Sequence, residues 1–427
     1  MSTAPPARTP SITASQGFLY GLLGLPLAFV ALPLYVILPN HYAREFGVPL
    51  ATLGAVLLGA RLFDAVIDPL IGRITDKLFA RSIRAVLAWA AAAAMLLALG
   101  FAMLFFPLTR EPSALVAWAC VVLVMTYAAY SALSVAHQSW GAMLGGDEAQ
   151  RSRIVSWREG LGLLGVLLAS VLPSTAGLPA TTAVFVIVLL CGWLAWARAQ
   201  PPVPQPHAQA FNLWLPFSRP AFRRLLAVFL LNGIASAVPA TLVLFFVQDR
   251  LQAPRSLEPA FLGSYFLCAA LSIPLWLQAV KRIGLARSWL CGMGLATAVF
   301  IWATQLGAGD TVAFIAVCAL SGVALGTDLA LPGAMLAGVI LDAGDRGQSE
   351  GAYFGWWNFA TKINLALAAG LALPMLGLFG YSPGARDPSA LQALVVAYCL
   401  LPCVLKMAAA AALYFLIIKP GPVKTTK

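Results

Sequence analysis

Long apolar runs, separated by short polar stretches, make up almost the whole chain. Each run is close to or above the roughly 20 residues with which an α-helix crosses the hydrocarbon core of a bilayer. Strands are excluded, because an open sheet cannot cross hydrocarbon with unpaired edges and the runs are too long for barrel strands. The pattern predicts an all-α membrane protein with twelve transmembrane helices, at about residues 17–39, 49–72, 83–107, 113–137, 155–177, 180–198, 223–247, 259–280, 285–306, 311–340, 350–378 and 389–418.

The composition agrees with a membrane protein. Of the 427 residues, 61% are apolar and only 10% are charged, whereas a soluble domain carries roughly 25% charged residues. This balance excludes an ordinary water-soluble enzyme and any disordered or fibrous class. The seven cysteines lie in apolar stretches without a CxxC pair, so they predict neither disulfides nor a metal site.

The positive charges predict the orientation of the chain. Most of the 27 Lys and Arg residues lie in the two tails and in the even-numbered loops between the predicted spans. Because positive residues gather on the cytoplasmic side of a membrane, both termini are expected in the cytoplasm. The net charge of +11 follows from this topology and requires no nucleic-acid partner.

The chain is predicted to consist of two related halves. The sequence Gly-Ala-Met-Leu occurs at 141–144 and again at 333–336, each time followed by an Asp and, four residues after it, an Arg. Between the halves lies the Pro-rich segment QPPVPQPHAQ, which is typical of a semi-stiff linker. Two repeats that meet at a midplane site are the architecture of many secondary transporters. We predict a cytoplasmic tail at 1–16, a six-helix bundle at 17–198, a cytoplasmic linker at 199–222, a pseudo-symmetric six-helix bundle at 223–418 and a cytoplasmic tail at 419–427.

Three charged residues lie within the second predicted span. Arg61, Asp64 and Asp68 are spaced i, i+3 and i+7, which places them on one face of a helix. An ionisable side chain at bilayer depth is a functional candidate by default, and paired carboxylates can hold Na⁺ or an exchangeable proton. The alternative is a structural ion pair between Arg61 and one aspartate, which leaves the second aspartate unexplained.

The second half also carries charges inside its spans, namely Asp328, Lys362 and Lys406. They either line the path of the solute or the coupling ion, or pair with one another and lock helices together. The sequence leaves both interpretations open.

Prolines interrupt several spans, which indicates helices that bend beside a cavity. Pro26 and Pro33 lie in the first span, and Pro239 follows Asn232 in the seventh. Such breaks are tolerated only inside protein or beside water. The first, fourth, seventh and tenth spans are therefore expected to line the cavity and to move.

The second span and the loop after it, DAVIDPLIGRITDK, resemble the glycoside–pentoside–hexuronide:cation symporter family of the major facilitator superfamily, to which the melibiose carrier belongs. The resemblance extends over most of the chain. It implies the major facilitator fold and cation-coupled transport by alternating access. It also implies a cytoplasmic gate of Gly72, Asp76 and Lys77, in which Asp76 meets the positive N-terminal end of the eleventh span. The basic residues of this loop are also explained by the orientation of the chain alone, because positive residues gather on the cytoplasmic side.

The same resemblance implies the cation site. Asp64 and Asp68 match the cation-binding carboxylates of the family, Arg61 matches the arginine beside them, and Ser131 stands where the family has a cation-ligating threonine. The family's asparagine ligand is replaced here by Ile67, which favours H⁺ over Na⁺ as the coupling ion.

For the solute, the resemblance matches Lys362 to a lysine implicated in coupling and Arg158 to an arginine that contacts sugar. The family's sugar-binding carboxylates on the first and fourth helices are missing, because the first span carries no charge and Ser134 takes the second position. These departures argue against a galactoside-like sugar.

The fourth span carries further polar candidates. His137 either shuttles protons or contacts the solute, or it is a histidine satisfied within the protein. Trp140 either stacks on a ligand ring or belongs to an interfacial aromatic belt. The full set of expected solute contacts is Ser134, His137, Gln138, Trp140, Arg158, Asn232, Asp328, Lys362 and Lys406.

Together these features predict a symporter, coupled to H⁺ or Na⁺, that carries a small polar solute such as a sugar or glycoside. The alternative is a transporter of the same fold for an amphiphile such as a lysophospholipid, and a membrane-embedded enzyme is a distant third because no catalytic motif is found. We expect a monomer in a bacterial inner (plasma) membrane, whose partners are the lipid bilayer and the solute. No cofactor is expected, and no metal beyond Na⁺ at Asp64 and Asp68.

Overall fold

The computed structural model describes residues 12–48, 50–202, 212–378, 380–381 and 384–420, and all regular elements within these ranges are helical. By internal contacts the chain divides into two compact units. Unit 1 comprises Met1–Leu215 and Gly333–Trp356, and unit 2 comprises Pro216–Pro332 and Trp357–Lys427. Unit 1 thus contains the residues predicted for the first bundle, together with a short segment of the second half.

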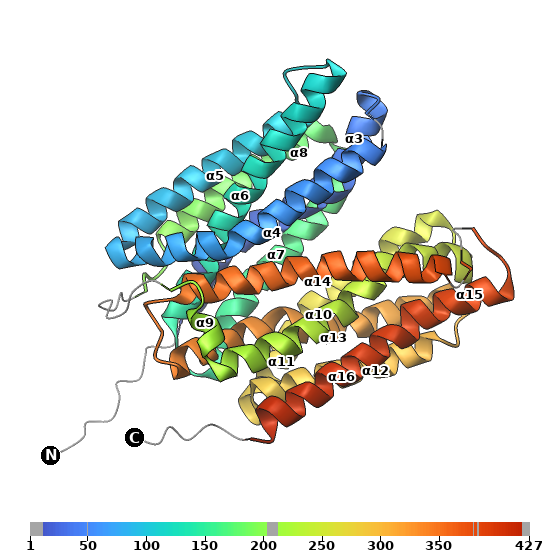
Figure 1. Cartoon of the computed structure of the whole chain (residues 1–427). Coiled ribbons are helices and arrows are strands. Elements are labelled where there is room, and N and C mark those ends of the chain that lie inside the picture. The colour runs from blue at the N-terminus through green and yellow to red at the C-terminus, as the bar shows by residue number, and fades with distance from the viewer. Residues whose placement is uncertain (1–11, 49, 203–211, 379, 382–383, 421–427) are drawn as a thin grey trace. The chain divides into compact units, whose positions relative to one another are not determined.

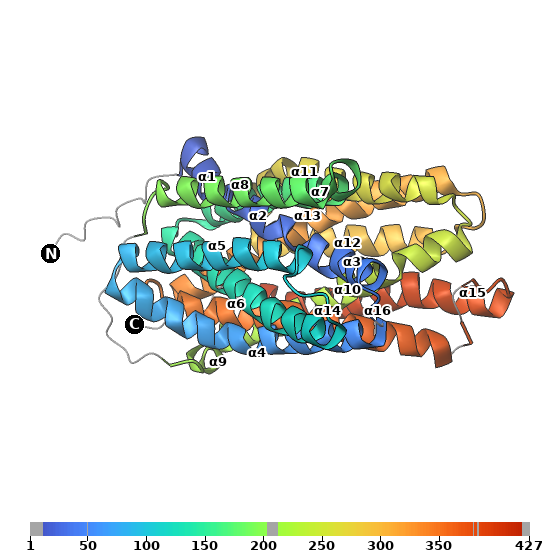
Figure 2. The ribbon, with the colours of Figure 1, turned by 90° about the horizontal axis from the view of Figure 1, so that it is seen from above.

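Unit 1 is built mainly from long helices (Figure 1). The helix α6 contacts both α4 and α5, and the three lie side by side in Figures 1 and 2. The elements of this unit are α1 (Ala14–Gly21), α2 (Gly24–Phe29), the π-helical turn η1 (Pro33–Ile37), α3 (Leu38–Glu45), α4 (Leu50–Arg81), α5 (Ile83–Phe105), α6 (Pro112–Leu144), α7 (Glu148–Thr175), α8 (Gly177–Ala197), and parts of α13 (Thr311–Asp342) and α14 (Glu350–Leu378).

The first predicted span is broken into short helices at its prolines. The helix α1 ends at Gly21, so that Leu22 lies outside it, and α2 ends at Phe29. Leu22 and Phe29 lie four residues before Pro26 and Pro33. In a regular α-helix their carbonyl groups would accept hydrogen bonds from the backbone N–H groups at positions 26 and 33. Because proline has no N–H to donate, the regular hydrogen bonding stops at both places, as the sequence predicts.

Polar residues between the apolar runs begin the next helices. Ser82 alone separates α4 from α5, and its hydroxyl accepts from the Ala85 amide at 3.1 Å. Asp147, from the repeated Asp-x-x-x-Arg motif, accepts from the Gln150 amide at 2.8 Å at the start of α7. Each side chain satisfies one of the amides that a helix N-terminus leaves without a partner.

The helices α2 and α7 pack closely because small residues face each other. A Cβ atom at Gly165 would lie 2.1 Å from the carbonyl oxygen of Leu25, and one at Gly24 would lie 2.4 Å from that of Arg158. Only glycine permits this backbone approach, which is a common way for membrane helices to associate.

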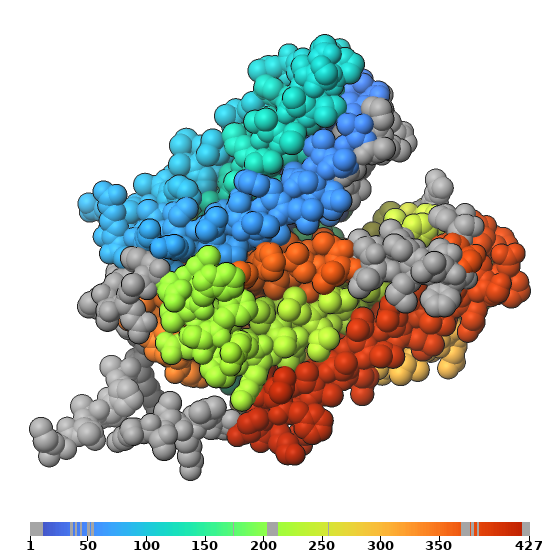
Figure 3. All heavy atoms as spheres, in the orientation of Figure 1, coloured from blue at the N-terminus to red at the C-terminus, as the bar shows by residue number. Residues whose placement is uncertain are grey.

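Unit 2 is also helical, and α10 packs along α16, which Figure 3 shows as adjoining green and red surfaces. The short helix α9 (Leu215–Ser218) begins with the last residue of the first segment of unit 1 and continues in unit 2. The other elements of this unit are α10 (Pro220–Phe245), the π-helical turn η2 (Phe246–Arg250), the 3₁₀ turn η3 (Arg255–Leu257), α11 (Glu258–Ile283), α12 (Leu285–Ala303), the remainder of α13 and α14, α15 (Pro388–Val395), the π-helical turn η4 (Val396–Leu400), α16 (Leu401–Leu413) and the π-helical turn η5 (Tyr414–Ile418).

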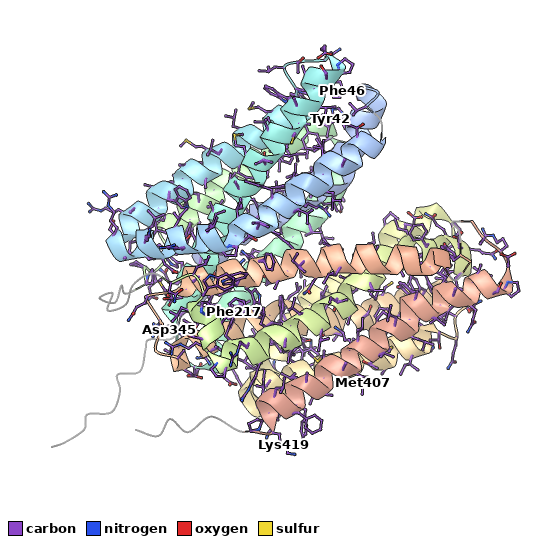
Figure 4. All side chains as sticks on the ribbon, in the orientation of Figure 1. Tyr42, Phe46, Phe217, Asp345, Met407 and Lys419 are labelled. Carbon is purple, nitrogen blue, oxygen red and sulfur yellow. The ribbon has the colours of Figure 1, made fainter. Side chains whose placement is uncertain are left out.

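Aromatic rings form the core of unit 2, and apolar side chains cover its outside. The rings of Phe246 and Tyr398 stack with centroids 4.3 Å apart, and that of Phe314 lies 5.6 Å from Phe246. By contrast, Met407 on α16 is 55% exposed (Figure 4). An apolar exterior of this kind fits contact with lipid.

Nine helices in the described part of the chain are long and apolar enough to cross a membrane, which makes this a multi-pass membrane protein. They are Ile83–Phe105, Pro112–Leu144, Glu148–Pro173, Gly177–Ala197, Pro220–Arg250, Glu258–Ile283, Leu285–Ala303, Thr311–Asp342 and Pro388–Ile418. These correspond to nine of the predicted spans, and the spans at 17–39, 49–72 and 350–378 remain predictions.

The close packing of α2 on α7 can be tested by adding single methyl groups. We expect Gly165→Ala to lower the thermal midpoint of the purified protein, because its Cβ would collide with backbone. Gly294→Ala is the matched control, since a Cβ there meets nothing within 4 Å; it should stabilise the protein by about 0.5–1 kcal/mol. Equal midpoints for the two variants would contradict the packing argument.

Candidate functional site

The acidic face of α4 lies inside unit 1. Asp64 and Asp68 are 2% and 0% exposed, although they belong to a helix with many lipid-type side chains. The hydroxyl of Ser131 on α6 donates to Asp64 Oδ1 at 2.8 Å. The structure thus brings together Asp64 and the serine expected beside the cation.

This face carries two acids and one arginine. Asp64 and Asp68 are four residues apart on one helix, a spacing at which like charges repel. With Arg61 included, the formal sum of the three side chains is still negative by one charge when both acids are ionised. Carboxylate and hydroxyl oxygens can ligate a monovalent cation, and a carboxylate can take up a proton. The ion-binding role of these residues remains a prediction.

Two polar pairs follow along α6. The Gln138 side-chain amide donates to the Ser134 hydroxyl at 3.0 Å. His137 is fully buried, its ring stacks on Tyr20 at 4.3 Å, and its Nε2 lies 2.8 Å from the Tyr20 carbonyl oxygen. Tyr20 in turn donates from its hydroxyl to the His137 carbonyl at 3.1 Å. His137 therefore links α6 to α1.

Trp140 packs within the protein. Its ring lies 5.1 Å from that of Trp196 and 6.3 Å from that of Phe79, and its Nε1 donates to the Gln200 carbonyl at 3.1 Å. With an exposed fraction of 1%, it contributes to the core of unit 1 in this structure. Stacking of Trp140 on a ligand remains a prediction.

Arg158 borders a small cavity of about 10 Å³ in unit 1, together with Tyr20, Gln138 and Arg151. Its Nε donates to Glu159 Oε1 at 2.9 Å, so the guanidinium charge is compensated by the adjacent residue. A cavity of this size holds about one water molecule. In this conformation there is no room for a solute in it.

Two of the three residues predicted to form a gate, Asp76 and Gly72, contact the start of α14 within unit 1. Asp76 Oδ1 accepts from the Gly351 amide at 2.6 Å, and Oδ2 accepts from the Ala352 amide at 2.9 Å. These amides belong to the first turn of α14, whose N–H groups have no partner in their own helix. A carboxylate is favoured there by the helix dipole as well.

Gly72 makes this contact possible. A Cβ at Gly72 would lie 2.0 Å from the Gly351 carbonyl oxygen. The side chain of Lys77, by contrast, is exposed. The pKa of Asp76 is raised well above its usual range, mainly by burial and further by the nearby Glu350 carboxylate. The two amide hydrogen bonds lower the pKa but do not offset these effects.

The repeated Asp-x-x-x-Arg motif contributes a second contact of the same kind. Arg346 donates from Nη2 and Nε to the Met143 carbonyl at 2.7 and 3.1 Å. Met143 lies in the last turn of α6, where carbonyls lack helical partners. Close by, Asp345 (labelled in Figure 4) accepts from the Tyr353 hydroxyl at 2.7 Å.

In unit 2, four helices meet at a charged network. Lys406 Nζ donates to Asp328 Oδ2 at 2.8 Å, to Asn232 Oδ1 at 2.9 Å and to the Ser236 hydroxyl at 2.8 Å. Asp328 also accepts from Trp289 Nε1 at 2.8 Å, Asn232 Nδ2 at 3.0 Å and Ser236 Oγ at 3.1 Å. The network joins α10, α12, α13 and α16.

All three N–H groups of Lys406 and both oxygens of Asp328 have partners in this network. The charges cancel, and the side chains are 8% and 13% exposed. Such an arrangement supports the interpretation of a pair that locks helices together. Sequence reasoning missed Ser236 and Trp289, because a serine and a tryptophan in an apolar span give no signal of an ionic partner.

Lys362 lies on the part of α14 that belongs to unit 2, and its side chain is half-buried. Nearby on the same helix, the buried Asn364 packs against Gly233, where a Cβ would lie 1.9 Å from its side-chain nitrogen. The role of Lys362 remains a prediction.

The family description MFS/sugar transport protein matches residues 17–419. The chain belongs to this family. Its members are transporters by that description, so a membrane-embedded enzyme is no longer a candidate.

Similar proteins agree with this assignment. The chain is 26% identical over 153 residues to the "Putative glycoside/cation symporter YagG" of Escherichia coli (strain K12); the match covers 35% of the chain and about a third of that relative. Two solved structures share the fold: a bacterial homologue of the iron transporter ferroportin (TM-score 0.69, 17% identity, 94% of this chain and 100% of that chain) and the E. coli fucose:proton symporter FucP (0.65, 16%, 93% and 98%).

The network of unit 2 predicts unequal effects of single and double substitutions. Asp328→Asn or Lys406→Met leaves one charge buried without its partner, which should cost about 3–5 kcal/mol of stability. The double variant should recover a large part of that loss, because no charge is left uncompensated. Unfolding of the purified variants measures the coupling, and simple additivity would contradict a compensated pair.

The contact of Asp76 predicts a pH-dependent stability. Because the folded-state pKa is raised, the folded protein holds this proton more tightly than the unfolded chain does. Asp76 thus contributes stability that is complete below an unfolded pKa of about 4 and is lost as the pH rises through the folded pKa. We expect Asp76→Asn to reduce the decline of the thermal midpoint with rising pH. An unchanged pH profile would contradict this assignment.

Proposed function

We propose that the protein is a cation-coupled symporter that imports a sugar or glycoside across a bacterial inner membrane by alternating access. The observation that carries the proposal is the pair of buried carboxylates Asp64 and Asp68, with the Ser131 hydroxyl bonded to one of them. The family and the relative whose name includes glycoside/cation symporter support it.

The proton is the coupling ion that these residues favour. Sodium requires several oxygen ligands around it, and Ile67 supplies none at the position where the resembling family has an asparagine. A proton needs only one carboxylate that water can reach in each state of the cycle. Arg61 on the same face would set the affinity by its charge.

The transport cycle requires the arrangement expected from the sequence. We propose twelve transmembrane helices in two six-helix bundles, as a monomer with both termini in the cytoplasm. The fold shared with two solved transporters supports this arrangement. Apart from the ion, no cofactor is proposed.

Asp76 and the first turn of α14 would form the cytoplasmic gate. Its two hydrogen bonds to backbone amides can be broken without changing the covalent structure or the helices themselves. Breaking them would free α14 from α4 when the cytoplasmic side opens. Arg346, bonded to the end of α6, would release in the same step.

For the solute we propose contacts from residues outside the charged network of unit 2. Ser134, Gln138 and Arg158 present hydroxyl, amide and guanidinium groups near one another on α6 and α7. Lys362 would link the solute to the coupling ion. An uncharged first span suits a solute without net positive charge.

Uptake into proteoliposomes tests the proposal. A panel of radiolabelled sugars and glycosides is offered with an imposed proton gradient, a sodium gradient or neither. We expect accumulation with the proton gradient and its loss in Asp64→Asn and Asp68→Asn. Asp387→Asn, the same chemical change at an exposed carboxylate without a side-chain cap bond, should behave like the wild type.

Folding is controlled in the same experiment. Solute counterflow without a gradient should persist in at least one aspartate variant, since exchange does not require net ion movement. Gradient-driven uptake by both variants at the wild-type rate would refute the coupling role. Binding of lysophospholipid, with no response to any sugar, would instead favour the amphiphile transporter, which the uncharged first span also permits.

A further inference from the structure

Unit 2 contains a cavity of about 420 Å³ that has no part in the roles described so far. It lies at the end of α10, beside the loop that precedes α15. Its volume is within the range of small-molecule sites. The lining residues with side-chain chemistry are Phe245, Gln248, Asp249, Gln252 and Arg386.

A buried aspartate fixes the shape of this cavity. Asp249 is 5% exposed, and its Oδ2 accepts from the Tyr381 hydroxyl at 2.5 Å and from the Gly384 amide at 2.9 Å. Arg386 donates from Nη1 to the Asp249 carbonyl at 2.7 Å. These bonds hold Tyr381, Gly384 and Arg386 against η2.

Gln252 has an unusual backbone for its residue type. Its φ is +52°, in the left-handed region that favours glycine, and it is the only non-glycine residue with a positive φ in the described ranges. The Ala253 amide bonded to Val247 and the Leu251 carbonyl bonded to Gly309 hold the segment in place on both sides. Glycine would adopt this conformation without strain, which suggests that the exposed glutamine side chain serves a purpose.

The lining chemistry suits hydroxyl groups. Gln252 offers an amide that can both donate and accept. Gln248 already donates from Nε2 to Glu258 Oε1 at 2.9 Å, so its carbonyl oxygen is the group that it offers as an acceptor. Arg386 is bonded to Asp249 through Nη1, and its other N–H groups can donate to a ligand. Phe245 adds an aromatic surface for the apolar face of a ring. The charges of Asp249 and Arg386 compensate each other, and the Glu258 carboxylate behind Gln248 disfavours an anion, so the lining suits a ligand without negative charge.

We propose that this cavity is an outer docking site, in which a neutral polyhydroxylated solute is held before it enters the transport path. The proposal rests on the proposed function and topology, in which Gln252, Gly384 and Arg386 lie on the side away from the cytoplasm. Binding of the solute in this cavity would raise its concentration near the transport path. The cavity itself would take no part in coupling to the ion.

The test separates capture from transport. Uptake of radiolabelled methyl glycosides by intact cells gives KM and the maximal rate for the wild type, Gln252→Ala and Gln305→Ala. Gln305 is an exposed loop glutamine of the same unit and does not line the cavity. We expect Gln252→Ala to raise KM about threefold or more, as for one lost hydrogen bond, with an unchanged maximal rate. Gln305→Ala should match the wild type.

An unchanged KM in Gln252→Ala would overturn the docking site and leave the symporter proposal intact. If wild-type cells take up no glycoside, the symporter proposal fails, and saturation-transfer NMR of the purified protein with methyl glucoside decides the docking site separately. A signal in the wild type and in Gln305→Ala that disappears in Gln252→Ala supports the site. No signal, or an equal signal in all three proteins, overturns it. Thermal midpoints within error of the wild type exclude misfolding as the cause.

Discussion

Charge compensation inside apolar helices is the constraint on which the polar interior of this protein depends. A charge in such surroundings is stable only when neighbouring groups balance and hydrogen-bond it. In unit 2, Asp328 and Lys406 balance each other, and their neighbours complete the hydrogen bonds. In unit 1, two acids and one arginine lie on one face of α4, and the Ser131 hydroxyl donates to Asp64. The charges of the first arrangement are paired and hydrogen-bonded, and the acids of the second are those for which we propose an exchangeable cation.

The polar contacts of the protein differ in how easily they can be broken and formed again. A network with every donor and acceptor engaged resists rearrangement, because any movement leaves a buried polar group without its bond. The contacts that Asp76 and Arg346 make with backbone at helix ends are different. Each uses groups that a helix leaves open in any conformation, so they can be exchanged for water at modest cost. Helix ends are therefore the natural places for a reversible contact in this fold.

The polar chemistry of the chain is distributed over places with distinct tasks. The acids of α4 lie within a bundle, while the cavity beside Gln252 lies at the end of one, next to loops. Within the bundle, glycine allows helices to approach closely, as Gly72 of α4 does against Gly351 of α14. Hydrogen bonds to Asp249 support the cavity, together with the burial of Leu251 and Tyr381 in the apolar core of unit 2. The contacts of α4 and the cavity beside Gln252 are thus stabilised by different interactions.

The sequence by itself determined the helical membrane class, most of the helix positions, the breaks before Pro26 and Pro33, and the acidic face of α4. These features are local: they depend on the length of apolar runs, the missing N–H of proline and the period of a helix. Only the tertiary structure decided that Lys406 pairs with Asp328, that Trp289 completes the pair, and that Gln252 borders a cavity. Such partners depend on which helices pack together, and a serine, a tryptophan or a backbone amide carries no mark in the sequence of the charge it will meet.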